Sequence, residues 1–133
     1  MNSYVIFTDS ACDINAEILQ GWGVQYASLT FRFDGSEEEF ANDAMPAKEF
    51  YDRMRAGGVA KTAAINVDGF AQAFEKILRE EKDVLYLGFS SGLSTTYNSA
   101  RLAMEGLRER YPDRKLVAVD TLAASAGMGM LVK

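Results

Sequence analysis

Residues 84–100 read VLYLGFSSGLSTTYNSA, and they establish the fold class of the chain. The segment begins as a short apolar run, continues as a turn of glycine, serine and threonine, and ends with helical spacing. This order is typical of a buried strand, a sharp turn and the start of a helix. We therefore predict a strand at 83–87 and a helix at 95–110.

The same alternation of strands and helices runs through the rest of the chain. Further strands are predicted at 3–8, 24–33 and 115–120, and further helices at 46–55, at 66–82, and after Asn15 and Thr121. Strands that alternate with helices form βαβ units. We expect a three-layer α/β domain whose mainly parallel sheet has helices on both faces, with ligands at the carboxyl ends of its strands.

Length, charge and hydropathy exclude several classes of protein. The 133 residues fit one domain, and the net charge of −5 argues against nucleic acid and against anionic lipid surfaces. The amino terminus MNSYVIFTDS has no basic segment before a long apolar run, and no apolar run approaches 18 residues. The sequence thus predicts no signal peptide, no membrane span and a cytoplasmic protein.

The absence of histidine and the single cysteine exclude much chemistry. Without histidine there is no Ser-His pair, no imidazole acid–base group and no histidine metal ligand. One cysteine, Cys12, forms neither an internal disulfide nor a thiolate zinc site, and we expect it to be buried. The acidic stretch at 34–43 lacks the spacing of a calcium loop. No metal and no cofactor are predicted.

The turn at 88–92 fits the G-x-S-x-G pattern of a hydrolase nucleophile elbow. Ser90 would need a base, and in this chain that base would have to be a lysine such as Lys61. The turn lacks the lysine of a phosphate-binding loop, which weakens a phosphoryl-transfer interpretation. An enzyme that uses the Ser90-Ser91 turn remains the alternative function.

The same turn could instead bind an anion through its hydroxyl groups, an arrangement we call an anion clamp, and this function requires no catalytic base. The hydroxyl-bearing residues between positions 90 and 96 are Ser90, Ser91, Ser94, Thr95 and Thr96. They precede a helix whose first N–H groups favour an anion such as a carboxylate. Asp9 and Ser10 follow the first strand and belong to the same edge of the sheet. The alternative, that Ser94 or Thr95 only caps the helix, stays open.

Five segments of the chain resemble the DegV family of bacterial fatty-acid-binding proteins in order and spacing. They are VIFTDSACDI, FRFDG, EFYDRMRAG, SSGLSTTYNSA and VAVDTLAASAGMGMLV. The resemblance covers essentially the whole chain, 1–133, but only the N-terminal domain of that family, so a second domain is expected to be absent or truncated. It implies a non-catalytic protein that presents a bound fatty acid to a separate fatty acid kinase.

The resemblance also implies which residues hold the ligand. A threonine of the family's TSQPS loop and a serine of its SSGLSGTY turn bind the fatty acid carboxylate, and these positions fall on Thr62 and Ser94. A family histidine from the second domain has no counterpart here. Thr95 replaces a glycine, so its backbone is expected to be right-handed or extended. A tail that runs between the sheet and its helices has as candidate lining residues Phe70, Phe74, Leu87, Leu93 and Met104, although for each of them ordinary core packing is the favoured interpretation.

Overall fold

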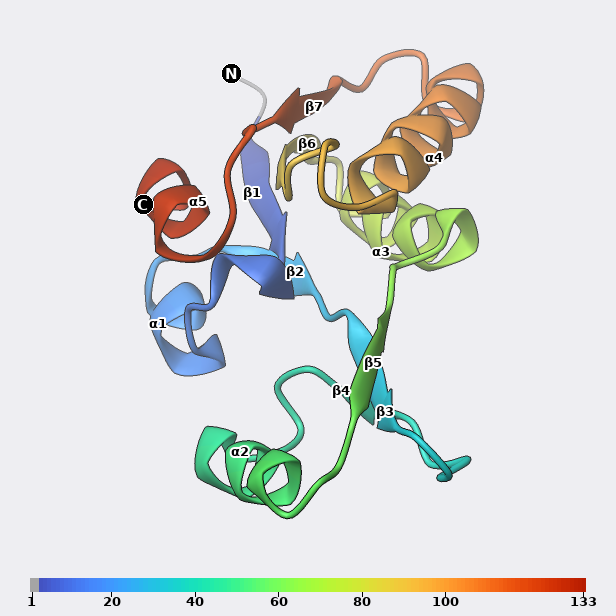
Figure 1. Cartoon of the computed structure of the whole chain (residues 1–133). Coiled ribbons are helices and arrows are strands. Elements are labelled where there is room, and N and C mark those ends of the chain that lie inside the picture. Colours follow the sequence, from blue (N-terminus) through green and yellow to red (C-terminus); the bar gives the residue numbers. More distant parts are fainter. Residues whose placement is uncertain (1–2) are drawn as a thin grey trace.

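Four parallel strands form the central sheet in the computed structural model, which describes residues 3–133 (Figure 1). The strands are β1 (Tyr4–Asp9), β2 (Gln25–Ala27), β6 (Asp83–Gly88) and β7 (Leu116–Asp120), in the order β2-β1-β6-β7. The chain leaves β1 toward β2 and later returns to the other side of β1 with β6. The carboxyl ends of β1 and β6 therefore flank the switch in strand order, where sheets of this kind bind ligands.

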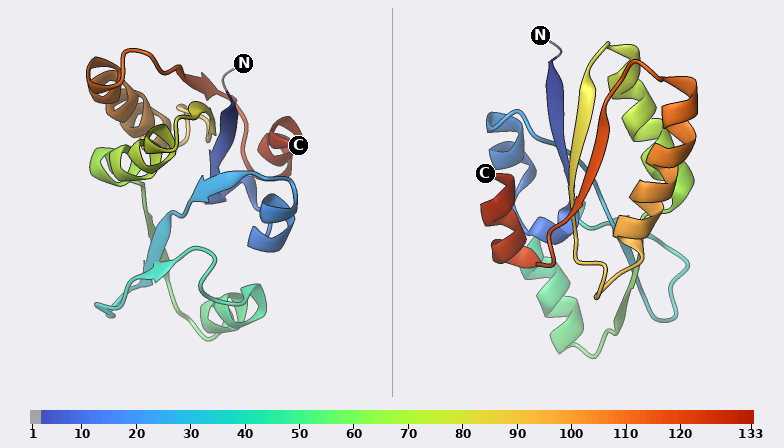
Figure 2. Two further views of the ribbon diagram at one scale, coloured as in Figure 1. Left: turned by 180° about the vertical axis from the view of Figure 1, so that it is seen from behind. Right: turned by 90° about the horizontal axis from the view of Figure 1, so that it is seen from above.

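Helices cover both faces of this sheet, as the right-hand view of Figure 2 shows. On one face lie α3 (Val67–Arg79) and α4 (Thr96–Arg110), and on the other lie α1 (Ala16–Gly21) and α5 (Ser125–Val132). The core between the sheet and α3 and α4 includes Phe7, Phe70, Phe74, Tyr86 and Met104. The core on the α1 and α5 side is smaller and includes Cys12, Leu19 and Met128. The predicted three-layer α/β architecture and the burial of Cys12 are confirmed.

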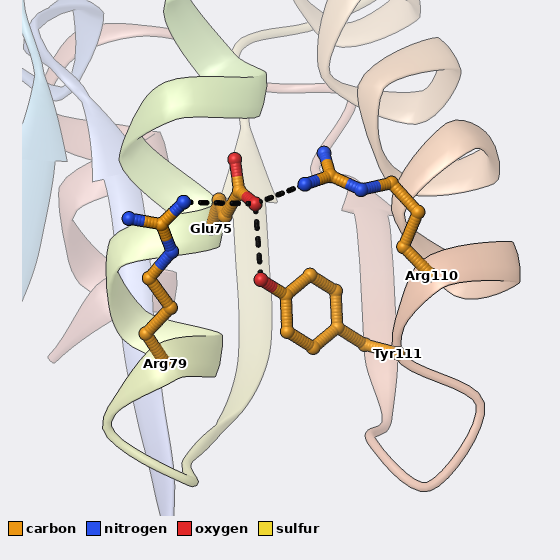
Figure 3. Close-up of polar contacts among 4 residues, drawn as sticks. All are labelled: Glu75, Arg79, Arg110 and Tyr111. Atoms are coloured by element: carbon orange, nitrogen blue, oxygen red, sulfur yellow. Dashed lines mark hydrogen bonds and ion pairs between the residues drawn. The ribbon is translucent and has the colours of Figure 1, made fainter.

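A polar cluster joins α3 to the end of α4 on the outside of the domain (Figure 3). The Glu75 carboxylate of α3 accepts hydrogen bonds from Arg79 one turn later, from Arg110 of α4 and, at 3.0 Å, from the Tyr111 hydroxyl. The hydrogen bond from Tyr111 and the two guanidinium groups lower the pKa of Glu75. One carboxylate of α3 is thereby linked to the C-terminal end of α4.

A second, antiparallel sheet stands apart from the first and was not predicted. It contains β3 (Thr30–Phe33), β4 (Phe40–Ala41) and β5 (Ala60–Ala63) in the order β4-β3-β5, with α2 (Ala47–Arg55) beside it. Four aromatic rings pack together between β3, β4 and α2, namely Phe31, Phe33, Phe40 and Phe50. This aromatic cluster gives the small sheet an apolar contact of its own.

The prediction of one strand at 24–33 is wrong, because the chain divides between the two sheets at Ser28 and Leu29. There the Ser10 hydroxyl accepts a hydrogen bond from the Leu29 N–H at 2.9 Å, and the Ser28 hydroxyl donates to Asp43 at 3.1 Å. These polar contacts interrupt strand pairing. The segment 61–66 was predicted as a loop, yet its first residues belong to β5, where Thr62 pairs with Phe31.

Helix ends differ from prediction by a few residues. α3 stops at Arg79 instead of residue 82, because Glu81 adopts a left-handed backbone with φ of 59° before β6 begins. α4 begins at Thr96 with Thr95 as its N-cap, and the last helix begins at Ser125. Within residues 3–133, no helix has the length and apolar character that crossing a membrane requires.

Candidate functional site

A pocket of about 810 Å³ lies where the two sheets approach each other, at the carboxyl end of β6. Its walls come from the turn after β6, the start of α4, the residues around β5 and the link between β2 and β3. The lining residues are Leu29, Thr62, Ala64, Phe89, Ser91, Leu93, Ser94, Thr95 and Asn98. Not one of these nine side chains is ionisable at neutral pH. A bound polar group would therefore meet hydroxyls and one amide, and an apolar group would meet Leu29, Phe89 and Leu93.

The structure brings Thr62 and Ser94 to the same pocket although 32 positions separate them in sequence. Thr62 arrives there because β5 pairs with β3, and β3 continues from β2 past the end of the main sheet. Within residues 3–133 the Thr62 hydroxyl has no hydrogen-bond partner. It is therefore free to donate to a ligand.

Ser94 is held by Thr96. The Ser94 Oγ accepts the Thr96 main-chain N–H at 3.2 Å and lies 2.8 Å from the Thr96 hydroxyl oxygen. Thr96 is completely buried, and this is the one partner of its hydroxyl among the described residues. When Thr96 donates to Ser94, the buried hydroxyl is satisfied and the Ser94 hydrogen remains available to the pocket.

Ser94 has features of both interpretations, the helix cap and the anion clamp. Thr95 occupies the N-cap position of α4 but makes no side-chain capping bond, whereas Ser94 accepts a first-turn N–H. The Thr95 backbone is right-handed, with φ of −77° and ψ of −4°, as its β-branched side chain led us to expect. Ser94 is thus both a helix-capping side chain and part of the pocket wall.

Asp9, predicted as a possible additional member of the site, does not line this pocket. Its carboxylate is completely buried and accepts from the Tyr86 hydroxyl at 2.6 Å, the Phe89 N–H at 3.0 Å and the Ala11 N–H at 3.1 Å. Burial raises the pKa of Asp9, and these hydrogen bonds oppose that shift. Asp9 therefore fixes the start of the turn that carries Phe89 into the pocket.

Ser10 and Ser90 also lie outside the pocket. Ser10 lines a separate pocket of about 520 Å³ beside Tyr26 and Asp43. Ser90 is buried in the turn, where its Oγ accepts the Gly92 N–H at 3.3 Å. Of the five side chains predicted as additional members of the site, Ser91 and Thr95 line it, and Asp9, Ser10 and Ser90 do not.

Lys61, the candidate base for a serine hydrolase, is paired elsewhere. The Lys61 ammonium pairs with Asp34 at 2.9 Å, on the far part of the small sheet. The main chain of Ser91 donates to Asp120 at 3.2 Å, and hydrogen bonding from Ser91 lowers the pKa of that carboxyl. Asp120 thus acts as an acceptor that ties β7 to the turn.

Most of the candidates for lining the ligand tail belong to the core, as the favoured interpretation of the sequence had it. Phe70, Phe74 and Met104 are completely buried between α3, α4 and the sheet, and Leu87 packs against the smaller core. Leu93 does line the pocket and is 68% exposed. The helical periodicity that identified these side chains does not separate core from pocket.

Asn98 is a pocket residue that the sequence analysis missed. It lies four positions after Ser94, at the spacing of one helical turn, and this spacing is the signal that points to it. Leu29, Ala64 and Phe89 were also missed, because each reaches the pocket only through the pairing of the small sheet or the position of the turn.

Fold and pocket together define an α/β protein with an uncharged polar pocket at the carboxyl edge of a parallel sheet. The chain belongs to the DegV family: the family model described as "Uncharacterised protein, DegV family" matches residues 3–133. A DegV domain-containing protein of Clostridium perfringens is 39% identical over 99% of this chain and 46% of its own length. The chain thus spans about half the length of the relatives it matches.

Solved structures of similar fold bind fatty acids. A stearic-acid-binding protein from Eubacterium ventriosum superposes with a TM-score of 0.88 at 28% identity, covering 97% of this chain and 45% of the other. A fatty-acid-binding DegV family protein from Thermus thermophilus superposes with a TM-score of 0.82 at 30% identity, covering 98% and 45%.

Proposed function

We propose that this chain binds a long-chain fatty acid and that Thr62 and Ser94 hold its carboxylate. The observation that carries the proposal is the uncharged pocket whose wall contains both the Thr62 hydroxyl and the Ser94 hydroxyl, with Ser94 held by Thr96. Solved relatives of the same fold bind stearic acid and other fatty acids, which supports the ligand class.

The two ends of the ligand contribute differently to the binding free energy. Burying a dozen methylene groups contributes about 10 kcal/mol before ordering costs. Each hydrogen bond from a hydroxyl to the carboxylate contributes about 1.5–3 kcal/mol. The tail therefore supplies most of the affinity, while Thr62 and Ser94 determine which end of the molecule lies in the pocket.

The same proposal includes a partner. Residues 3–133 correspond to about half the length of the related DegV proteins, and in this proposal they supply the carboxylate end of the binding site. The bound carboxylate is presented in the cytoplasm to a separate fatty acid kinase, and this chain performs no catalysis. Support comes from the likeness to the family and from the polar residues at the pocket.

Mass spectrometry of ligands extracted from the purified chain tests the proposal directly. We expect a co-purified fatty acid, released by organic solvent and identified by its mass. A fluorophosphonate probe on the same sample tests the enzyme alternative, and we expect no labelling because Ser90 is buried without a base. Labelling of Ser90, with no fatty acid found, would replace this proposal with a hydrolase.

A further inference from the structure

Asn98 occupies a position from which its side chain can meet the ligand. It lies in the first turn of α4 and shares the pocket with Thr62 and Ser94. Side chains of a helix lean toward its N-terminus, so Asn98 leans over the turn that carries Ser94 and Thr95. It brings the one amide group among the pocket's lining residues.

Arg101 determines which end of the Asn98 amide is free. The Arg101 guanidinium lies 3.1 Å from the Asn98 Oδ1, and its other branch pairs with Glu105. A guanidinium group only donates hydrogen bonds, so the Asn98 atom that faces it must be the oxygen. The Asn98 NH₂ group is then turned away from Arg101, with both of its hydrogens available.

We infer that Asn98 is a third carboxylate ligand, which donates from its Nδ2 to the anion held by Thr62 and Ser94. This inference rests on the proposed function and adds a residue to it. The pocket contains no cation, so a carboxylate there depends on the number of neutral donors that converge on it. Arg101 is a positioning residue, since it reaches the ligand only through Asn98.

Direct observation of the Asn98 side chain tests this assignment. We propose titrating the ¹⁵N-labelled chain with octanoate, a soluble carboxylate, and with octan-1-ol as the neutral probe. Octanoate should shift the Asn98 side-chain NH₂ resonances downfield together with the main-chain resonances of 94–98, and octan-1-ol should leave the NH₂ resonances in place. Main-chain shifts without an NH₂ shift would overturn the role of Asn98 and leave the proposed function standing. The absence of any shift would contradict both.

A variant that introduces a negative charge supplies the second measurement. Asn98→Asp keeps the shape and the acceptor for Arg101, and an acidic residue suits the first turn of a helix, so folding should be preserved. It replaces the donor with a negative charge, and we expect octanoate affinity at pH 7 to fall about tenfold or more. Leu102→Asp adds the same charge on the exposed side of α4 and serves as the control. Equal losses in the two variants would show a long-range charge effect and would refute direct contact.

Arg101→Leu tests whether Arg101 acts by positioning Asn98 or by contacting the ligand itself. This variant leaves the Asn98 amide in place but releases its oxygen, so we expect a smaller loss of octanoate affinity, about threefold. The double variant Asn98→Ala with Arg101→Leu should bind no more weakly than Asn98→Ala alone. A further loss in the double variant would show that Arg101 acts on the ligand independently of Asn98.

Discussion

The Thr96 hydroxyl oxygen lies 2.8 Å from the Ser94 Oγ, and Thr96 is completely buried beneath the pocket. A hydroxyl of the pocket wall is therefore held by a neighbour that does not line the pocket. The Thr96 N–H also donates to the Ser94 Oγ, and when the Thr96 hydroxyl donates as well, the serine hydrogen is left for the pocket.

Removing either clamp hydroxyl should weaken fatty acid binding. Thr62→Ala and Ser94→Ala each lose one hydrogen bond to a carboxylate, and we expect stearate affinity to fall about tenfold in each. Calorimetric or fluorescence titration measures the change, with Ser36→Ala in an exposed loop as the control. Unchanged affinity in both pocket variants would eliminate the clamp.

Thr96 should matter through its hydroxyl alone. Thr96→Val keeps the shape of the buried side chain but frees Ser94 to rotate, so we expect stearate to bind about threefold to tenfold more weakly. Thr96→Ser keeps the hydroxyl and should restore most of the affinity. If the serine variant binds as weakly as the valine variant, then packing by the Thr96 methyl, and not orientation of Ser94, explains the loss.

The buried Asp9 carboxylate should be important for stability. Asp9→Asn has one acceptor oxygen in place of two, so it leaves without an acceptor either the Ala11 N–H or both the Tyr86 hydroxyl and the Phe89 N–H. We expect the unfolding free energy to drop by about 2–3 kcal/mol. Urea unfolding monitored by circular dichroism measures it. Asp13→Asn is the matched control, since Asp13 is exposed and asparagine tolerates its left-handed backbone. Similar losses in the two variants would contradict the role of Asp9.

Two glycines of α5 should respond oppositely to alanine. A Cβ on Gly129 would lie 2.7 Å from the Ile14 Cδ1 and 3.2 Å from the Cys12 carbonyl oxygen, so Gly129→Ala should destabilise the chain by about 1–2 kcal/mol. A Cβ on Gly127 would meet Ala123 only at 3.9 Å, so Gly127→Ala should be neutral or stabilise the helix. Thermal unfolding of both variants gives the comparison. Equal melting temperatures would show that α5 shifts freely to accept the methyl group.

The hydrogen bond between Tyr26 and Asp43 should make the free energy of unfolding depend on pH in the alkaline range. The hydrogen bond to Asp43 raises the pKa of Tyr26 from 10 to about 12. Between these values the folded chain keeps a proton that the unfolded chain has lost. The resulting stabilisation is complete below pH 10 and disappears as the pH rises to 12.

Comparison of wild type with Tyr26→Phe tests this sign. The difference in unfolding free energy between the two should be largest below pH 10 and should shrink toward pH 12. Urea unfolding at pH 9, 10 and 11 measures it, and Tyr51→Phe, at an exposed position, is the control. A difference that stays constant over this range would contradict the raised pKa.

Local pattern predicted the main sheet and its helices well. The run at 84–87 is apolar and short, Asn66 caps α3 as expected, and the periodic side chains Phe70 and Phe74 are buried as the spacing requires. The second sheet escaped prediction because β5 is a short, mostly exposed strand, and its partners in β3 lie far from it in sequence, as Phe31 does from Thr62. Nothing in the local periodicity of AKTA distinguishes it from a loop.

The sequence by itself determined the α/β class, the turn after β6 and, through family resemblance, the choice of Thr62 and Ser94. These follow from short-range periodicity, from turn residues and from motifs, all of which are local. Tertiary structure alone decided that Thr62 and Ser94 line one pocket, that the buried Asp9 accepts from Phe89 in the turn, and that Ser94 contacts Thr96. A pocket forms from contacts between distant segments, and those contacts depend on strand order and packing, which local sequence does not encode.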